Sequence, residues 1–148
     1  MDKKKVLFVC IHNSARSQMA EAYFNLFIKG DFIAESAGIE AGSLNPLVVE
    51  VMKEDNIDIS GNKTNVVFDY YKEGRTYSYV ITVCDKEAAE RCPLFPGVTR
   101  RLHWSFQDPS TQNGSQDEKL KVIRIIRDRI KEAVRKFAAE LDSMHTGE

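Results

Sequence analysis

The residues with the clearest chemical meaning lie near the amino terminus, where a cysteine and an arginine are spaced to hold a tetrahedral oxyanion. Cys10 ends an apolar run, residues 6–9, that is typical of a buried strand, and five residues separate it from Arg16. A helical pattern follows directly. A short loop between a strand and a helix N-terminus directs backbone N–H groups at one anion, and the planar guanidinium can donate to two of its oxygens. The stretch therefore predicts a thiol facing a bound oxyanion.

We expect this loop to activate its thiol. A cysteine beside a helix N-terminus and an arginine is more acidic than a free cysteine, so Cys10 should be a thiolate nucleophile at neutral pH, solvated by Ser14 or Ser17. The loop has no glycine, and Asn13 is the residue in it that best tolerates left-handed backbone. The alternative is a buried cysteine followed by an unrelated surface arginine, which the strand before and the helix after disfavour. The predicted oxyanion-binding loop is Ile11, His12, Asn13, Ser14, Ala15, Arg16 and Ser17.

The remaining elements must position this loop. Hydrophobic spacing predicts helices over residues 17–29, 45–55 and 64–71, and a capping-box pattern at residues 115–118 precedes a long last helix. Strands are expected over residues 6–10, 32–36, 79–83 and 99–104, with a turn at Ala37 and Gly38. Alternating strands and helices predict an α/β fold in three layers, with a four-stranded parallel sheet and helices on both of its faces.

Chemistry-bearing side chains follow three of the four predicted strands. Cys10 ends the first strand, Cys84 follows the third, and Trp104 follows the fourth with Asp108 four residues further on. The carboxyl ends of parallel strands meet at one edge of a sheet, so we expect these residues to gather there. A buried strand-end cysteine and an ordinary Asp-Pro turn are the simpler interpretations of Cys84 and Asp108.

Composition restricts the classes of function. The 148 residues are 43% hydrophobic, which suits one domain over residues 1–148. The net charge of −1 argues against nucleic acid or an anionic membrane surface as a partner. We expect a cytoplasmic protein, because the sequence shows no membrane-spanning run and no signal-peptide pattern. We also expect a monomer. Three cysteines are too few for a disulfide scaffold, and redox or catalytic roles are the better interpretation.

The sequence CIHNSARS resembles the phosphate-binding loop of the low-molecular-weight protein tyrosine phosphatase superfamily. Within that superfamily, the chain is most fully similar to the thioredoxin-coupled arsenate reductases, from residue 4 to the end of the last predicted helix. The further matching stretches are SQMAEA, ESAGIE, the Asn-Pro at residues 45–46, the DIS at residues 58–60, VITVC and HWSFQDP. The resemblance implies that Asp108, aimed by Pro109, is the general acid that protonates the leaving oxygen.

The resemblance also implies a relay of three thiols. Cys10 would attack arsenate, Cys84 would attack Cys10 and release arsenite, and Cys92 would then attack Cys84. Thioredoxin or glutaredoxin would reduce the final disulfide, and no bound cofactor is required. Three residues, Asn13, Glu21 and Ser36, match positions that hold a potassium ion in some reductases. Asn65 stands where a carboxylate is expected in that site.

Two other functions remain open at this point. A tyrosine phosphatase would use Cys10 to form a phospho-enzyme, but Ser110 and Thr111 replace the aromatic pair that usually follows its Asp-Pro. Ala15 also stands where such phosphatases usually carry a second loop cysteine. A non-catalytic oxyanion-binding module is disfavoured because a nucleophile, an arginine and an acid are all present. A zinc site is disfavoured because Cys84, Cys92 and His103 match no usual ligand spacing.

Overall fold

The computed structural model describes residues 3–98, 100–111 and 113–145, which form a four-stranded parallel sheet between layers of helices. The strand order is β2-β1-β3-β4, and each neighbouring pair is parallel. The strands are β1 (Lys4–Cys10), β2 (Phe32–Gly38), β3 (Tyr79–Thr82) and β4 (Arg100–His103). The predicted α/β class and parallel sheet are confirmed.

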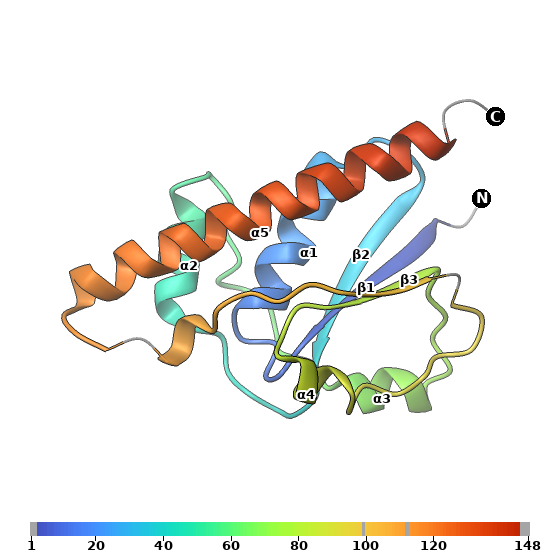
Figure 1. The fold of residues 1–148 in the computed structure, drawn as a ribbon, viewed down its shortest axis with the longest axis horizontal. Helices are drawn as coiled ribbons and strands as arrows, with labels where there is room; N and C mark the ends of the chain where they lie inside the picture. The colour runs from blue at the N-terminus through green and yellow to red at the C-terminus, as the bar shows by residue number, and fades with distance from the viewer. Residues whose placement is uncertain (1–2, 99, 112, 146–148) are drawn as a thin grey trace.

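Helices cover both faces of this sheet. The long helix α5 crosses one face together with α1 and α2, whereas α3 lies on the other face and α4 lies near the carboxyl ends of the strands (Figure 1). The helices are α1 (Arg16–Phe27), α2 (Pro46–Lys53), α3 (Val67–Lys72), α4 (Lys86–Ala89) and α5 (Gln116–His145), with a 3₁₀ turn, η1, at Pro109–Thr111.

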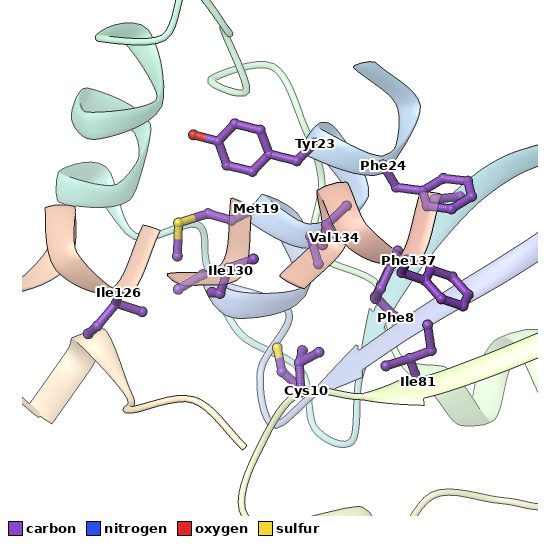
Figure 2. Packing of buried hydrophobic residues seen from close by; sticks show 14 of the residues in the cluster. Phe8, Cys10, Met19, Tyr23, Phe24, Ile81, Ile126, Ile130, Val134 and Phe137 are labelled. Carbon is purple, nitrogen blue, oxygen red and sulfur yellow. The ribbon is translucent and has the colours of Figure 1, made fainter. Parts of the chain in front are cut away.

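The central strand β1 divides the core into two apolar clusters. Side chains alternate along a strand, so Val6 and Phe8 face α1 and α5, whereas Leu7 and Val9 face α3. Figure 2 shows the larger cluster, in which α5 packs on α1 and on the sheet. The predicted apolar stripe of α5 is buried there, namely Leu120, Ile123, Ile126, Ile130, Val134, Phe137 and Leu141. This stripe is core packing, as the sequence predicts.

Local sequence signals place most element boundaries. Asn45 caps α2 by accepting a hydrogen bond from the backbone N–H of Leu47 at 3.0 Å, with Pro46 in the first helical position. Ser115 caps α5 by accepting from the N–H of Glu118 at 3.2 Å. The predicted turn at residues 37–38 is wrong, because β2 continues to Gly38 beside Cys10. Residue 99 of the predicted fourth strand lies outside the described residues.

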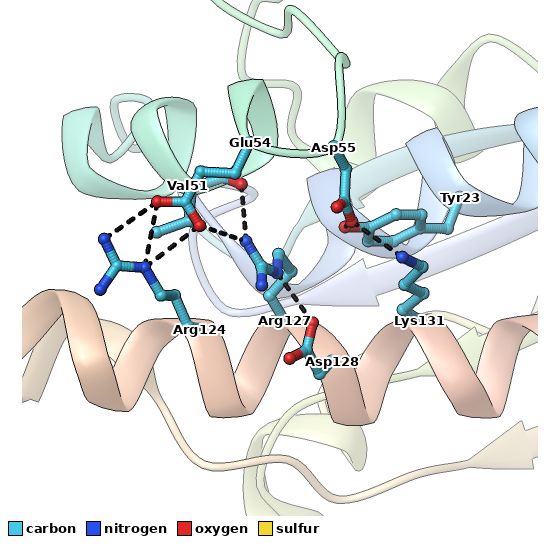
Figure 3. A network of polar contacts seen from close by, with 8 residues as sticks. All are labelled: Tyr23, Val51, Glu54, Asp55, Arg124, Arg127, Asp128 and Lys131. Carbon is cyan, nitrogen blue, oxygen red and sulfur yellow. Dashed lines mark hydrogen bonds and ion pairs between the residues drawn. The ribbon is translucent and has the colours of Figure 1, made fainter.

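A polar network ties α5 to α2 (Figure 3). The Arg127 guanidinium donates to the carbonyl of Val51 at 2.9 Å and to Glu54 Oε1 at 2.7 Å. One turn further along α5, Lys131 Nζ donates to Asp55 Oδ2 at 3.0 Å, and the Tyr23 hydroxyl of α1 donates to the same oxygen at 2.6 Å. The network fixes α1, which carries Arg16, relative to the two helices that cover it.

Candidate active site

The loop between β1 and α1 curls around the sulfur of Cys10. The Cys10 side chain is buried, and its Sγ lies 2.8 Å from the hydroxyl of Ser17. The backbone N–H of Asn13 donates to the same sulfur at 3.2 Å. The amide is a donor to this sulfur, and in the Cys10–Ser17 pair either atom can be the donor. The structure therefore places the predicted nucleophile and its predicted hydroxyl partner Ser17 in contact.

Asn13 holds the loop in shape through its backbone and its side chain. Its φ of 55° lies in the left-handed region that the glycine-free sequence predicts for it. The fully buried amide group donates to the hydroxyls of Ser17 at 2.7 Å and Ser36 at 2.9 Å. Its carbonyl oxygen accepts from Gln18 Nε2 at 3.2 Å and from the N–H of Asn65 at 3.0 Å. One side chain thus joins the loop to α1, β2 and the segment before α3.

Two glycines allow neighbouring segments to press against the loop. A Cβ on Gly38, the last residue of β2, would lie 2.7 Å from the backbone N of Asn13. A Cβ on Gly42 would lie 2.7 Å from the Cβ of His12. Neither support was predicted from the sequence, because the available signal, a glycine at the end of a predicted strand, favoured a turn.

Arg16 and Asp108 face each other across the mouth of the loop. Arg16 Nη2 lies 3.7 Å from Asp108 Oδ2, and Arg16 Nη1 donates to the carbonyl of Phe106 at 3.1 Å. The guanidinium is 3% exposed, whereas the carboxylate is 28% exposed and borders solvent. The N–H and hydroxyl of Ser110 both donate to Asp108 Oδ1, at 2.8 and 2.7 Å. The structure therefore brings the predicted acid to the loop.

The two remaining thiols lie in different parts of the core. Cys84 is fully buried in the same apolar cluster as Cys10, on the side of α1 and α5. Burial and the neighbouring Cys10 raise the pKa of the Cys84 thiol to about 11, and Arg16 opposes this shift. Cys92 is buried in the smaller cluster on the side of α3. The structure thus brings Cys84, but not Cys92, to the side of the sheet that holds Cys10.

The three residues of the predicted cation site are linked to one another by hydrogen bonds. The Ser36 hydroxyl donates to Glu21 Oε1 at 2.9 Å and accepts from the Asn13 amide. Burial raises the pKa of the Glu21 carboxyl, which favours its neutral form and weakens it as a ligand for a cation. Among the described residues, no group of three or more His, Cys, Asp or Glu side chains is arranged to hold a metal ion. A potassium ion at this position stays a prediction.

His103 and Trp104 support the segment that leads to Asp108. His103 Nδ1 lies 2.7 Å from the Thr82 hydroxyl, which ties the ends of β4 and β3 together. The Trp104 ring packs on Phe8 and Phe137, with centroid distances of 6.1 and 5.5 Å. Both side chains therefore act as supports for this segment. In the described part of the chain, no helix is long and apolar enough to cross a membrane.

Comparison with known proteins agrees with this geometry. The profile of the family described as low molecular weight phosphotyrosine protein phosphatase matches residues 5–146. An arsenate reductase of Bacillus subtilis is 39% identical over 138 residues, which cover 93% of this chain and 97% of the relative. A solved arsenate reductase in its oxidized state superimposes with a TM-score of 0.78 and 31% identity, over 93% of this chain and 98% of that one.

A further solved structure bears on the reductant. A thioredoxin-dependent arsenate reductase of Corynebacterium glutamicum superimposes with a TM-score of 0.60 and 26% identity, over 90% of this chain and 63% of that one. The family profile covers most of this chain, and the Bacillus subtilis relative exceeds 30% identity over almost its whole length. The chain therefore belongs to the low molecular weight phosphotyrosine protein phosphatase family.

Proposed function

We propose that this chain reduces arsenate to arsenite through Cys10, Cys84 and Cys92. The observation that carries the proposal is the second buried thiol, Cys84, in the same core cluster as Cys10 and under the electrostatic influence of both Cys10 and Arg16. A phosphatase releases its product to water and has no use for this thiol. The Bacillus subtilis relative bears the name arsenate reductase, which supports the same conclusion.

The loop begins the reaction by binding arsenate. The oxyanion accepts hydrogen bonds from the loop and from Arg16, whose charge opposes that of the anion. The Cys10 thiolate attacks arsenic, a sulfur–arsenic bond forms, and one oxygen leaves as water after protonation by Asp108. The separation of 3.7 Å between Arg16 and Asp108 supports these roles, because an acid must lie close to the anion that it protonates.

The electrons come from two thiols. The Cys84 thiolate attacks the sulfur of Cys10, so that a Cys10–Cys84 disulfide forms and the sulfur–arsenic bond breaks. Its electron pair stays on arsenic, which leaves as arsenite, and the two cysteines are oxidised by two electrons in total. Cys92 then attacks Cys84, which regenerates the Cys10 thiolate and leaves a Cys84–Cys92 disulfide. A dithiol protein of the thioredoxin type would reduce that bridge, as the name of the Corynebacterium glutamicum relative suggests.

A phosphatase is the second candidate, because Cys10, Arg16 and Asp108 alone are sufficient for phosphoryl transfer and the family is described by that activity. One experiment separates the two. Arsenate-dependent NADPH consumption is measured with thioredoxin and its reductase, in parallel with aryl phosphate hydrolysis. Cys10→Ser is the control for both assays.

We expect arsenate turnover with feeble aryl phosphate cleavage, and both should disappear in Cys10→Ser. Fast aryl phosphate cleavage without arsenate turnover would refute the reductase. Silence in both assays, with phosphate still protecting Cys10 from alkylation, would indicate an oxyanion-binding module. Turnover with glutaredoxin in place of thioredoxin would keep the reductase and change its reductant.

A further inference from the structure

We infer that Arg101 of β4 is a positioning residue for Cys92, which it holds in place for the second thiol exchange; the inference rests on the proposed relay. The Arg101 guanidinium donates to two successive backbone carbonyls. Its Nη2 lies 3.2 Å from the oxygen of Cys92, and its Nη1 lies 3.2 Å from the oxygen of Pro93. Two bonds from one planar group fix both the position and the orientation of this short piece of backbone.

The place of Arg101 in the sheet connects the two thiols of this exchange. Arg101 pairs with Val80 of β3, and β3 leads directly to Cys84. The Arg101 guanidinium therefore holds Cys92 close to β4. The neighbouring strand, β3, is the one that Cys84 follows. Between the two cysteines, regular structure is limited to the four residues of α4. A groove of about 350 Å³ separates α4 from β4, and Arg101 lines it together with Lys86 and Glu90.

The charge of Arg101 also acts on the thiol. Cys92 is 5% exposed, and burial raises the pKa of its thiol to about 11, while Arg101 acts in the opposite direction. A thiol must be deprotonated to attack a disulfide. Arg101 thus stabilises the reactive thiolate of Cys92, whereas burial favours the unreactive thiol.

The other groups near Cys92 offer little charge. Arg91, its neighbour in the chain, is exposed and lies 4.0 Å from Glu40 Oε2 on a different segment. Tyr70 and Tyr77 share the apolar cluster with Cys92, but burial raises the pKa of both hydroxyls, so they stay neutral. Among the residues that the structure describes, the guanidinium of Arg101 is therefore the charged group that acts on this thiol.

The step that Arg101 serves is an exchange without net redox change. After Cys92 loses its proton to solvent, its thiolate attacks the Cys84 sulfur of the Cys10–Cys84 disulfide. The Cys84–Cys92 bond forms, the Cys10–Cys84 bond breaks, and Cys10 leaves as a thiolate. Among the described residues, the Arg101 guanidinium donates its hydrogen bonds to Cys92 and Pro93 and to no residue of the oxyanion loop, so we expect arsenate binding and the first disulfide not to depend on it.

The test uses oxidised glutathione, which loads the relay without arsenic. Cys10 attacks the glutathione disulfide and releases one glutathione, and Cys84 then displaces the second one from Cys10. Reduced protein is mixed with oxidised glutathione and quenched with an alkylating reagent at successive times, and the disulfides are located by peptide mapping. The variants are Arg101→Ala, Arg101→Lys and Arg100→Ala. Arg100 precedes Arg101 on β4 but lines a different groove, beside Tyr79 and Phe137, and is the matched control.

In Arg101→Ala, we expect the Cys10–Cys84 bridge to form at the wild-type rate and its conversion to Cys84–Cys92 to slow about tenfold, equivalent to about 1.4 kcal/mol. Arg101→Lys keeps the charge but can reach only one carbonyl at a time, so its rate should lie between the two. Arg100→Ala should match wild type. In the assay with arsenate and thioredoxin, Arg101→Ala should have the wild-type kcat/KM for arsenate and a lower kcat than wild type.

Three results would overturn the inference. They are a second exchange in Arg101→Ala as fast as in wild type, an equal slowing of both exchanges, and a lysine variant no faster than the alanine variant. An alanine variant that does not fold leaves the comparison of the lysine variant with Arg100→Ala to decide. A wild-type protein that passes through both exchanges with glutathione but does not turn over arsenate would refute the proposed function and leave the role of Arg101 intact.

Discussion

Replacement of Asn13 by alanine should lower the free energy of unfolding more than any other single change in the loop. The side chain makes four hydrogen bonds, to Ser17, Ser36, Gln18 and the backbone of Asn65, and it is fully buried. At a net value of about 1 kcal/mol each, their loss costs about 4 kcal/mol, less whatever water or repacking restores. Alanine at a φ of 55° adds roughly 1 kcal/mol of backbone strain. We expect Asn13→Ala to lower the free energy of unfolding by about 3–5 kcal/mol.

A glycine variant separates the two causes. Asn13→Gly loses the same hydrogen bonds but accepts the left-handed backbone, so it should be about 1 kcal/mol more stable than Asn13→Ala. Asn62→Ala is the control, because Asn62 is exposed and donates one hydrogen bond to Gln18 at 3.0 Å. It should cost less than about 1 kcal/mol.

The assay is equilibrium urea unfolding, with the alkylation rate of Cys10 recorded in parallel. Ser17 loses one of its two partners when the amide of Asn13 is removed, so the hydroxyl beside the Cys10 sulfur is less well oriented. Cys10 should therefore be alkylated more slowly at neutral pH in both Asn13 variants than in wild type. An Asn13→Ala protein within about 1 kcal/mol of wild type, with an unchanged alkylation rate, would refute the role assigned to this side chain.

Three further predictions follow from named contacts. Arg16→Lys should weaken phosphate binding about tenfold or more, measured as protection of Cys10 from alkylation, because the lysine loses the bidentate fork and the bond to the Phe106 carbonyl; unchanged protection would contradict this. Cys92→Ser should release one arsenite per protein and stop with Cys10 joined to Cys84. A Cys10–Cys92 bridge as the first disulfide in wild type would reverse the proposed order of Cys84 and Cys92. Tyr23 and then Lys131 hold the pKa of the Asp55 carboxyl below its ordinary value. This contribution is present above the unfolded pKa and is lost as pH falls through the folded one, so Asp55→Asn should flatten the decline of the unfolding free energy below about pH 4.

Much of the fold could be predicted from the sequence because its signals are local. The periodicity of β1 and α5, the Asn45 cap and the capping box at Ser115 each lie within one element. The predicted helix over residues 64–71 begins only at Val67, and long-range hydrogen bonds explain the delay. The N–H of Asn65 donates to Asn13, and its carbonyl accepts from the N–H of Gly38 at 2.8 Å. A backbone that is already bonded in this way cannot enter a helix at that residue.

The candidate site likewise has one part that local sequence signals predict and another part that depends on long-range contacts. Cys10, Asn13 and Arg16 lie within seven consecutive residues, so their spacing alone predicts an oxyanion loop. The approach of Asp108 to that loop needed only the rule that parallel strands end at one edge. The carbonyl of Phe106 and the contact of Arg101 with Cys92 could not be predicted, because backbone acceptors carry no signal in residue type. Predicting them requires the register of β3 with β4, which depends on the packed sheet.

The division of the core by the sheet supports the proposed order of the relay. Cys10 and Cys84 lie in the cluster between the sheet and α5, whereas Cys92 lies in the cluster against α3. Besides burial, both Cys10 and Cys92 act to raise the pKa of Cys84, so Cys84 is the thiol that the other two influence. We therefore expect Cys84 to react with Cys10 first, and Cys92 to react after the segment that contains α4 has moved. That movement would break the hydrogen bonds of a helix only four residues long, which has few of them to lose. A short α4 between Cys84 and Cys92 thus suits a relay whose first two thiols share one cluster and whose last thiol lies in the cluster on the other side of the sheet.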